Sequence, residues 1–84
     1  MRYEYPAVIK YDDGVYYLNF PDLSGCFTDG STLKEVLENG EDALKTMLSY
    51  YESIGKEPKS PSGINDIQLG VGEIVSLLRV ETVV

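Results

Sequence analysis

The stretch FPDLSGCFTDGSTL, residues 20–33, decides how this chain folds. Pro21 cannot donate a hydrogen bond to a sheet, so it predicts the end of the strand that precedes it. Two turns follow, a Pro-Asp-x-x-Gly turn and an Asp-Gly turn, because Asp and Gly tolerate the backbone conformations that turns require. Thr32 and Glu35 then have capping-box spacing, with Ser31 as the competing N-cap. The stretch therefore predicts a strand, two turns and the start of a helix.

Upstream of this stretch the sequence predicts strands. In residues 3–11 every second residue is apolar or aromatic, and this alternation indicates a first strand. Asp12-Asp13-Gly14 then favours a two-residue hairpin turn. Residues 15–20 predict the returning strand, and Cys26 to Thr28 a short third one. Pro6 favours an edge position or a bulge in the first strand.

Downstream, apolar residues recur at three- and four-residue steps from Leu33 to Ile54 and predict a long amphipathic helix. Gly40 lies on its apolar face, where glycine costs about 1 kcal/mol relative to alanine, so we expect the helix to approach the sheet closely there. Gly55 is expected to end the helix. Five side chains are assigned to the core: Phe20, Leu33, Leu37, Leu44 and Leu48.

The last third of the chain predicts a connector and a closing strand. Residues 56–63 are stiffened by two prolines, and residues 67–71 are expected to be extended. Residues 73–84 place apolar groups on both faces of a strand, which is stable only when both faces are covered. We expect a second subunit to supply that cover, with Ile74 to Val80 as the self-interface. The order β-β-β-α-β predicts an α+β fold, an antiparallel sheet with one long helix packed on one face.

Length and composition restrict the class of protein. A chain of 84 residues predicts one small domain with a thin core, and 43% hydrophobic with 25% charged residues is ordinary for a globular protein. The sequence contains no apolar run of about 18 residues, lacks a signal-peptide pattern and has one cysteine. We therefore expect a cytoplasmic protein.

The charge balance restricts the partners. Fourteen acidic and seven basic residues give a net charge of −7. This argues against direct nucleic-acid binding, which needs clustered Lys and Arg. The acidity indicates either solubility alone or a basic protein partner.

The sequence offers little for catalysis. Histidine is absent, and Cys26 has no basic neighbour in sequence, so we expect it to be a small buried apolar residue. Asp12, Asp13, Asp22 and Asp29 at strand ends permit the hypothesis of a metal-dependent nuclease, but turn chemistry is the simpler explanation of these residues. We expect no catalytic residue, no metal and no cofactor. The seven tyrosines indicate either cross-strand packing or contacts to a protein partner.

From Tyr5 to about Ser62 the ordered motifs resemble the N-terminal domain of HicB-type antitoxins. The matching segments are Tyr11-Asp12-Asp13-Gly14, Val15 to Phe20, Pro21 to Cys26, Thr28 to Glu35, Glu41-Asp42-Ala43-Leu44, and the tail Pro58, Pro61, Ser62. Two positions depart from the family pattern: Gly40 replaces the usual alanine, and Glu57 replaces an apolar residue.

The resemblance implies a cut-down ribonuclease H-like fold, dimers or tetramers, and a partner. That partner is a HicA-type toxin, a small basic protein that cleaves mRNA and that the antitoxin would inhibit by masking. Longer members add a DNA-binding module, and we expect residues 1–84 to form a single HicB-like domain without it. The alternatives are a solitary oligomeric adaptor or regulator without a toxin, and the nuclease.

Five residues are predicted to contact the partner from their charge or their place on a surface. They are Asp22, Asp29, Glu38, Asp42 and Tyr17. The acidic members would attract a basic partner, and tyrosine is enriched in protein interfaces.

Overall fold

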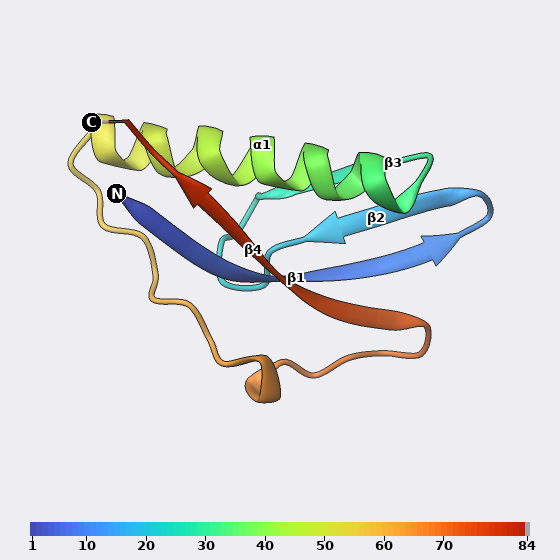
Figure 1. The fold of residues 1–84 in the computed structure, drawn as a ribbon. Coiled ribbons are helices and arrows are strands. Elements are labelled where there is room, and N and C mark those ends of the chain that lie inside the picture. Colours follow the sequence, from blue (N-terminus) through green and yellow to red (C-terminus); the bar gives the residue numbers. More distant parts are fainter. Residues whose placement is uncertain (84) are drawn as a thin grey trace.

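The computed structural model describes residues 1–83 and shows one antiparallel sheet covered on one face by one helix (Figure 1). The strands are β1 (Arg2–Asp12), β2 (Val15–Asn19), β3 (Phe27–Gly30) and β4 (Glu73–Glu81), and the helix is α1 (Leu33–Ser53). A short 3-10 helix, η1 (Ile64–Asp66), lies in the segment between α1 and β4, residues 54–72, which we call the connector from here on. The sheet order is β3-β2-β1-β4. The predicted α+β fold, with elements in the order β-β-β-α-β, is confirmed.

The hairpin between β1 and β2 has the expected two-residue turn. Asp13 and Gly14 have φ values of 49° and 84°, and Asp12 pairs with Val15 across the turn. Two positive φ angles define the type I′ turn, whose twist matches that of the flanking strands. Pro6 lies where β1 is paired on one side only, to β4, because the pairing with β2 begins at Val8.

The ends of α1 follow the predicted signals. The hydroxyl of Thr32 accepts a hydrogen bond from the backbone N–H of Glu35 at 3.0 Å, and the Glu35 carboxylate accepts one from the N–H of Ser31. At the other end Gly55 has a φ of 71°, and Lys56 N–H donates to the Tyr51 carbonyl at 2.9 Å. This is the Schellman arrangement, which satisfies carbonyl groups that the helix leaves unpaired.

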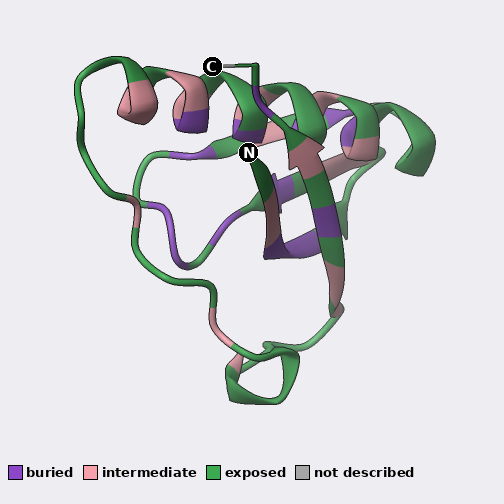
Figure 2. Ribbon diagram, turned by 60° about the vertical axis from the view of Figure 1, so that its left-hand side comes forward, coloured by how far each residue is buried: buried purple, intermediate pink, exposed green. Residues whose placement is uncertain are grey.

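The core lies between α1 and the sheet, and the buried turns of the helix face the strands (Figure 2). Phe20, Leu44 and Leu48 are buried as predicted. Leu37 is only half-buried, and Leu33 is 41% exposed, so its assignment to the core was wrong. Leu33 opens the helix, and helical side chains lean toward the helix N-terminus, so it points past the sheet rather than onto it.

Three boundaries differ from the predictions. The third strand covers residues 27–30 rather than 26–28, and residues 67–71, predicted to be extended, form no strand, although the backbone of Ile67 is extended. Gly70 and Gly72 explain the second difference, since glycine weakens a strand and Gly72 has a φ of 77°. The closing strand ends at Glu81, and Val84 lies outside the described residues.

Candidate functional site

The turn after β2 is a compact loop closed by its own backbone. Phe20 N–H donates to the Cys26 carbonyl at 3.0 Å, and Cys26 N–H donates to the Leu23 carbonyl at 3.1 Å. Gly25 has a φ of 83°, which glycine adopts without steric cost. The loop thereby buries Leu23 and Cys26 and turns the Asp22 side chain toward the connector.

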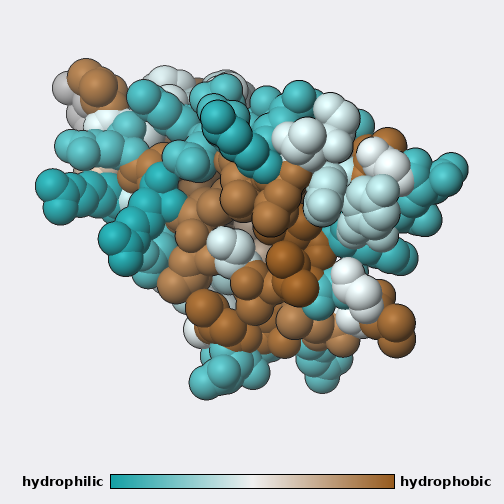
Figure 3. All heavy atoms as spheres, turned by 45° about the vertical axis from the view of Figure 1, so that its right-hand side comes forward, coloured by the Kyte–Doolittle hydropathy of each residue, from teal (hydrophilic) through white to brown (hydrophobic). Residues whose placement is uncertain are grey.

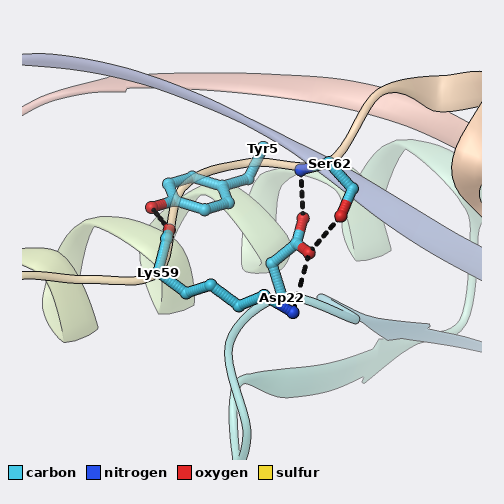
Figure 4. A network of polar contacts seen from close by, with 4 residues as sticks. All are labelled: Tyr5, Asp22, Lys59 and Ser62. Carbon is cyan, nitrogen blue, oxygen red and sulfur yellow. Dashed lines mark hydrogen bonds and ion pairs between the residues drawn. The ribbon is translucent and has the colours of Figure 1, made fainter.

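The Asp22 carboxylate is buried and binds another part of the same chain. The sequence had instead predicted it as a surface contact to a partner. It is 7% exposed, and its two oxygens accept hydrogen bonds from the backbone N–H and the hydroxyl of Ser62, at 2.8 and 2.6 Å. Lys59 adds an ion pair at 3.8 Å (Figure 4). Because the carboxylate is fully engaged within the chain, it holds the connector against the turn.

Tyr5 belongs to the same cluster. Its hydroxyl donates to the backbone carbonyl of Lys59, which fixes the connector a second time (Figure 4). Burial, and secondly the charge of Asp22, raise the pKa of the Tyr5 phenol, so it remains a neutral donor. In this cluster, therefore, the Asp22 carboxylate and the Tyr5 hydroxyl are both engaged in contacts that hold the connector in place.

The other four candidate residues lie on two opposite faces. Tyr17 pairs with Asp29 across β2 and β3, on the face away from the helix, because the neighbouring Leu18 packs against Gly40 of the helix. Glu38 and Asp42 lie one turn apart on the exposed side of α1. These residues therefore form two pairs on different faces, and Asp29 and Glu38 lie toward the same end of the molecule.

Carboxylates gather at one end of the molecule. Tyr16 pairs with Gly30, so the β1–β2 turn and the beginning of α1 lie at the same end (Figure 1). We call this region the acidic end. Its members are Asp12, Asp13, Asp29, Glu35 and Glu38, all exposed, and the exposed Glu41 and Asp42 continue the acidic run into the middle of α1.

The basic residues that form ion pairs lie elsewhere. Arg2 pairs with Glu81 at 3.8 Å, Arg79 pairs with Glu4, and Lys59 pairs with Asp22. In residues 1–83 no carboxylate of the acidic end forms an ion pair. The acidic end thus keeps its charge available for a partner.

An apolar groove between β3 and α1 was missed by the sequence analysis as a site. It is lined by Phe27, Ala43, Met47 and Tyr50, among others, and Phe27 and Tyr50 are 71% and 60% exposed. Tyr50 is one of the seven tyrosines for which the sequence left cross-strand packing and partner contact as alternatives. Phe27 carried no signal, because β3 is too short to show a period.

Cys26 and the carboxylates were the sequence candidates for chemistry. Burial raises the pKa of the Cys26 thiol, which therefore stays protonated and unreactive. Within residues 1–83, no three His, Cys, Asp or Glu side chains are grouped so that they could hold a metal ion. The single helix is too polar to span a membrane.

Comparison with known proteins identifies relatives. The family model described as HicB_like antitoxin of bacterial toxin-antitoxin system matches residues 5–78. Antitoxin HicB 1 of Photorhabdus laumondii is 30% identical over 80 residues, which is 89% of this chain and 52% of that protein. The UPF0150 protein Ta0767 of Thermoplasma acidophilum is 44% identical over 54 residues, 63% of this chain and 74% of that protein. The chain thus spans about half the length of the curated HicB antitoxin.

Solved structures share the fold. A chain of a toxin-antitoxin complex from Streptococcus pneumoniae superposes with a TM-score of 0.88 at 24% identity, covering 96% of this chain and 70% of that one. A chain of the HicA3 and HicB3 toxin-antitoxin complex superposes with a TM-score of 0.70 at 27% identity, covering 95% and 98%. The sheet with one helix is therefore the fold of proteins solved in such complexes.

Proposed function

This chain belongs to the family of HicB-like antitoxins of bacterial toxin–antitoxin systems, and we propose that it binds and masks a HicA-type toxin. The observation that carries the proposal is the family match over residues 5–78. The 27% identical chain from the complex of HicA3 and HicB3 supports it, since it covers nearly the whole domain. The partner would be a small basic protein that cleaves mRNA. The chain itself performs no chemistry in this proposal.

The charge distribution supports a basic partner and indicates where it docks. The chain carries a net charge of −7, and the acidic end concentrates carboxylates that form no ion pair in residues 1–83. A surface of one sign attracts an oppositely charged protein and accelerates their encounter. An RNA-cleaving toxin needs a basic surface for its substrate, and the acidic end would occupy that surface. Glu38 and Asp42 on α1 are the central residues of this proposed contact.

Co-expression with the HicA-type toxin tests the proposal directly. We expect a complex that co-elutes in size-exclusion chromatography with light scattering, and we expect RNA cleavage by the toxin to be lost in it. A catalytically silenced toxin variant serves to titrate binding without toxicity. If the two proteins elute separately and cleavage continues, the chain is a solitary regulator and the proposal fails.

Charge reversal locates the contact. In the variant Glu38→Lys with Asp42→Lys, we expect the toxin affinity to fall at least about tenfold and to depend less steeply on salt concentration. The matched control is Glu57→Lys with Asp66→Lys, which makes the same charge change in the exposed connector. Helical circular dichroism verifies folding of both variants. Equal affinities for both variants would show that α1 is not the docking surface.

A further inference from the structure

The groove between β3 and α1 is an open surface with an apolar floor. Gly25 before β3 and Ala43 and Met47 of the helix lie along it, and it encloses about 600 Å³. Two large side chains that also line it, Phe27 and Tyr50, are mostly exposed. Cavities of roughly 300–1,000 Å³ with aromatic linings are typical of binding sites. Exposed apolar surface of this kind marks an interaction site in a soluble protein.

The rim of the groove carries one charge. Among the residues of 1–83 that line it, Asp42 is the only charged one, and its side chain is exposed. Asp42 forms no ion pair in residues 1–83. Tyr50 follows Asp42 by two turns of the helix, about 12 Å at a rise of about 1.5 Å per residue. The groove therefore runs from a free carboxylate to an aromatic ring.

This combination selects the side chain of an arginine. A purely aliphatic side chain would cover the floor but would remove water from Asp42 without pairing its charge, which is unfavourable. Arginine has an apolar stem and a charged head, so the stem can lie on Ala43 and Met47 while the guanidinium reaches Asp42. The planar guanidinium also stacks on aromatic rings and binds a carboxylate through two hydrogen bonds, which the ammonium group of lysine does not do.

The tyrosine next to Tyr50 already binds a cation of the same chain. Lys56 Nζ lies 4.9 Å from the ring centre of Tyr51. The Tyr50 ring lies 6.4 Å from that of Tyr51, and in residues 1–83 no cation lies over Tyr50 or Phe27. Cations bind aromatic faces within about 6 Å of the ring centre, and the attraction grows when water is excluded. The ring of Tyr50 is thus free to bind a cation from another molecule.

A second apolar surface lies at the opposite edge of the sheet. Figure 3 shows hydrophobic atoms gathered below the helix on the side of the molecule that carries β4. Ile74 of β4 is 54% exposed and begins the segment that we predict as a self-interface. Because β3 and β4 are the two edges of the sheet, this surface and the groove are separate.

We propose that the groove between β3 and α1 holds an arginine of the HicA-type toxin, with its guanidinium on Asp42 and its stem against Met47 and Tyr50. This inference rests on the proposed function and adds to it the side chain that this chain takes from the toxin. Arginine binds phosphate through the same paired hydrogen bonds that it makes with a carboxylate. Asp42 therefore takes the place of an RNA phosphate, and an arginine held in the groove is withdrawn from RNA.

Two substitutions test the charge and the ring separately. Asp42→Asn keeps the size of the side chain, and Tyr50→Ala removes a ring that is 60% exposed, so both variants should fold, which helical circular dichroism verifies. We expect each to raise the dissociation constant for a catalytically silenced toxin at least about tenfold. Tyr50→Phe, which keeps the ring, should bind like the wild type. The matched controls Asp66→Asn and Leu69→Ala, both at exposed positions of the connector, should also bind like the wild type.

Arginine variants of the toxin identify the occupant. We expect one arginine-to-alanine variant of the toxin to lose as much affinity as Asp42→Asn causes. Combining that variant with Asp42→Asn should weaken the complex no further, because the pair is already broken. With every other arginine variant, Asp42→Asn should still weaken the complex about tenfold. If Asp42→Asn weakens the complexes of all arginine variants equally, no arginine occupies the groove and the proposal is overturned.

The outcomes separate this inference from the proposed function. The toxin docks elsewhere if the wild-type chain forms a complex with it and Asp42→Asn and Tyr50→Ala bind as tightly as the wild type. In that case the inference fails and the proposed function stands. If the wild-type chain and the toxin form no complex, the proposed function fails and the inference fails with it.

Discussion

At the scale of single residues, two glycines show how closely the elements approach. A Cβ atom at Gly40 would lie 2.9 Å from a methyl carbon of Leu18 and 3.0 Å from one of Leu78, so these two side chains of the sheet pack directly against the helix backbone there. This confirms the reason predicted for a glycine in the middle of a helix. At Gly30 the clash would be with the backbone of Val36, at 2.7 Å from its nitrogen. The end of β3 therefore packs directly against the backbone of the first turn of α1, and only glycine fits at position 30.

One hydrogen bond at the residue scale predicts how stability depends on pH. The hydroxyl of Tyr3 donates to the Glu52 carboxylate at 2.6 Å, which raises the pKa of Tyr3 from 10.0 to about 12 and lowers that of Glu52 below 4.5. A raised tyrosine pKa stabilises the fold below pH 10, and this stabilisation is lost as the pH rises toward 12. A lowered glutamate pKa stabilises it above pH 4.5, and this stabilisation is lost as the pH falls further.

Tyr3→Phe should therefore make folding stability less dependent on pH, both at alkaline and at acidic pH. We expect chemical-denaturation midpoints of the variant to change less than those of the wild type between pH 10 and 12 and below pH 4.5. Tyr50→Phe is the matched control, since Tyr50 is 60% exposed. Parallel profiles for Tyr3→Phe and the wild type would show that the hydrogen bond does not form in solution.

At the scale of elements, the connector between α1 and β4 depends on the turn after β2. Its residues contain only the three-residue η1, so few hydrogen bonds of its own hold it in place. Asp22 binds Ser62 twice, and Tyr5 binds the carbonyl of Lys59. A long connection is thereby fixed by side chains from a loop and a strand that lie far away in sequence.

Asp22→Ala should release the connector. The substitution leaves the N–H and hydroxyl of Ser62 without their acceptor, which costs about 1–3 kcal/mol when such groups are buried. We expect faster amide hydrogen exchange at Ser62 and a lower unfolding midpoint, with unchanged exchange in the middle of α1. Asp66→Ala, an exposed carboxylate in the same connector, should leave both quantities unchanged. Unaltered exchange at Ser62 in Asp22→Ala would contradict the anchoring role.

At the scale of the whole molecule, the chain has little stability to lose. Domains gain roughly 0.05–0.15 kcal/mol per residue on folding, so 84 residues correspond to about 4–13 kcal/mol. The core is one layer between a single helix and a single sheet, and the far face of the sheet retains exposed apolar residues.

Truncation of Leu44, a completely buried core residue, should remove a large part of this stability. Leu44 is completely buried, and Leu44→Ala should cost about 2–5 kcal/mol in urea denaturation. Leu33→Ala makes the same chemical change on the same helix at a side chain that is 41% exposed, and it should cost less than about 1 kcal/mol. If both variants lost equal stability, Leu33 would be part of the core and the position of the first helical turn would be wrong.

The sequence alone determined the elements and their ends, because the forces that set them act over a few residues. The Asp-Gly turn, the Thr32 cap, Gly55 at the helix end and the apolar period of α1 all depend on neighbours along the chain. The order of motifs in residues 5–62 also pointed to the family, and the family model confirms it over residues 5–78. The acidic character that supports a basic partner was equally visible in the composition.

Only the tertiary structure decided what each surface residue does. Asp22 is internal because Ser62, 40 residues away, closes over it, and no local pattern encodes that contact. Glu38 joins Asp29 at one end because β3 pairs with β2 and leads directly into the helix. The open edge of β4 follows from the strand order, which places the last strand beside the first. Contacts between residues far apart in the chain depend on how all elements pack together, so they emerge only when the fold is complete.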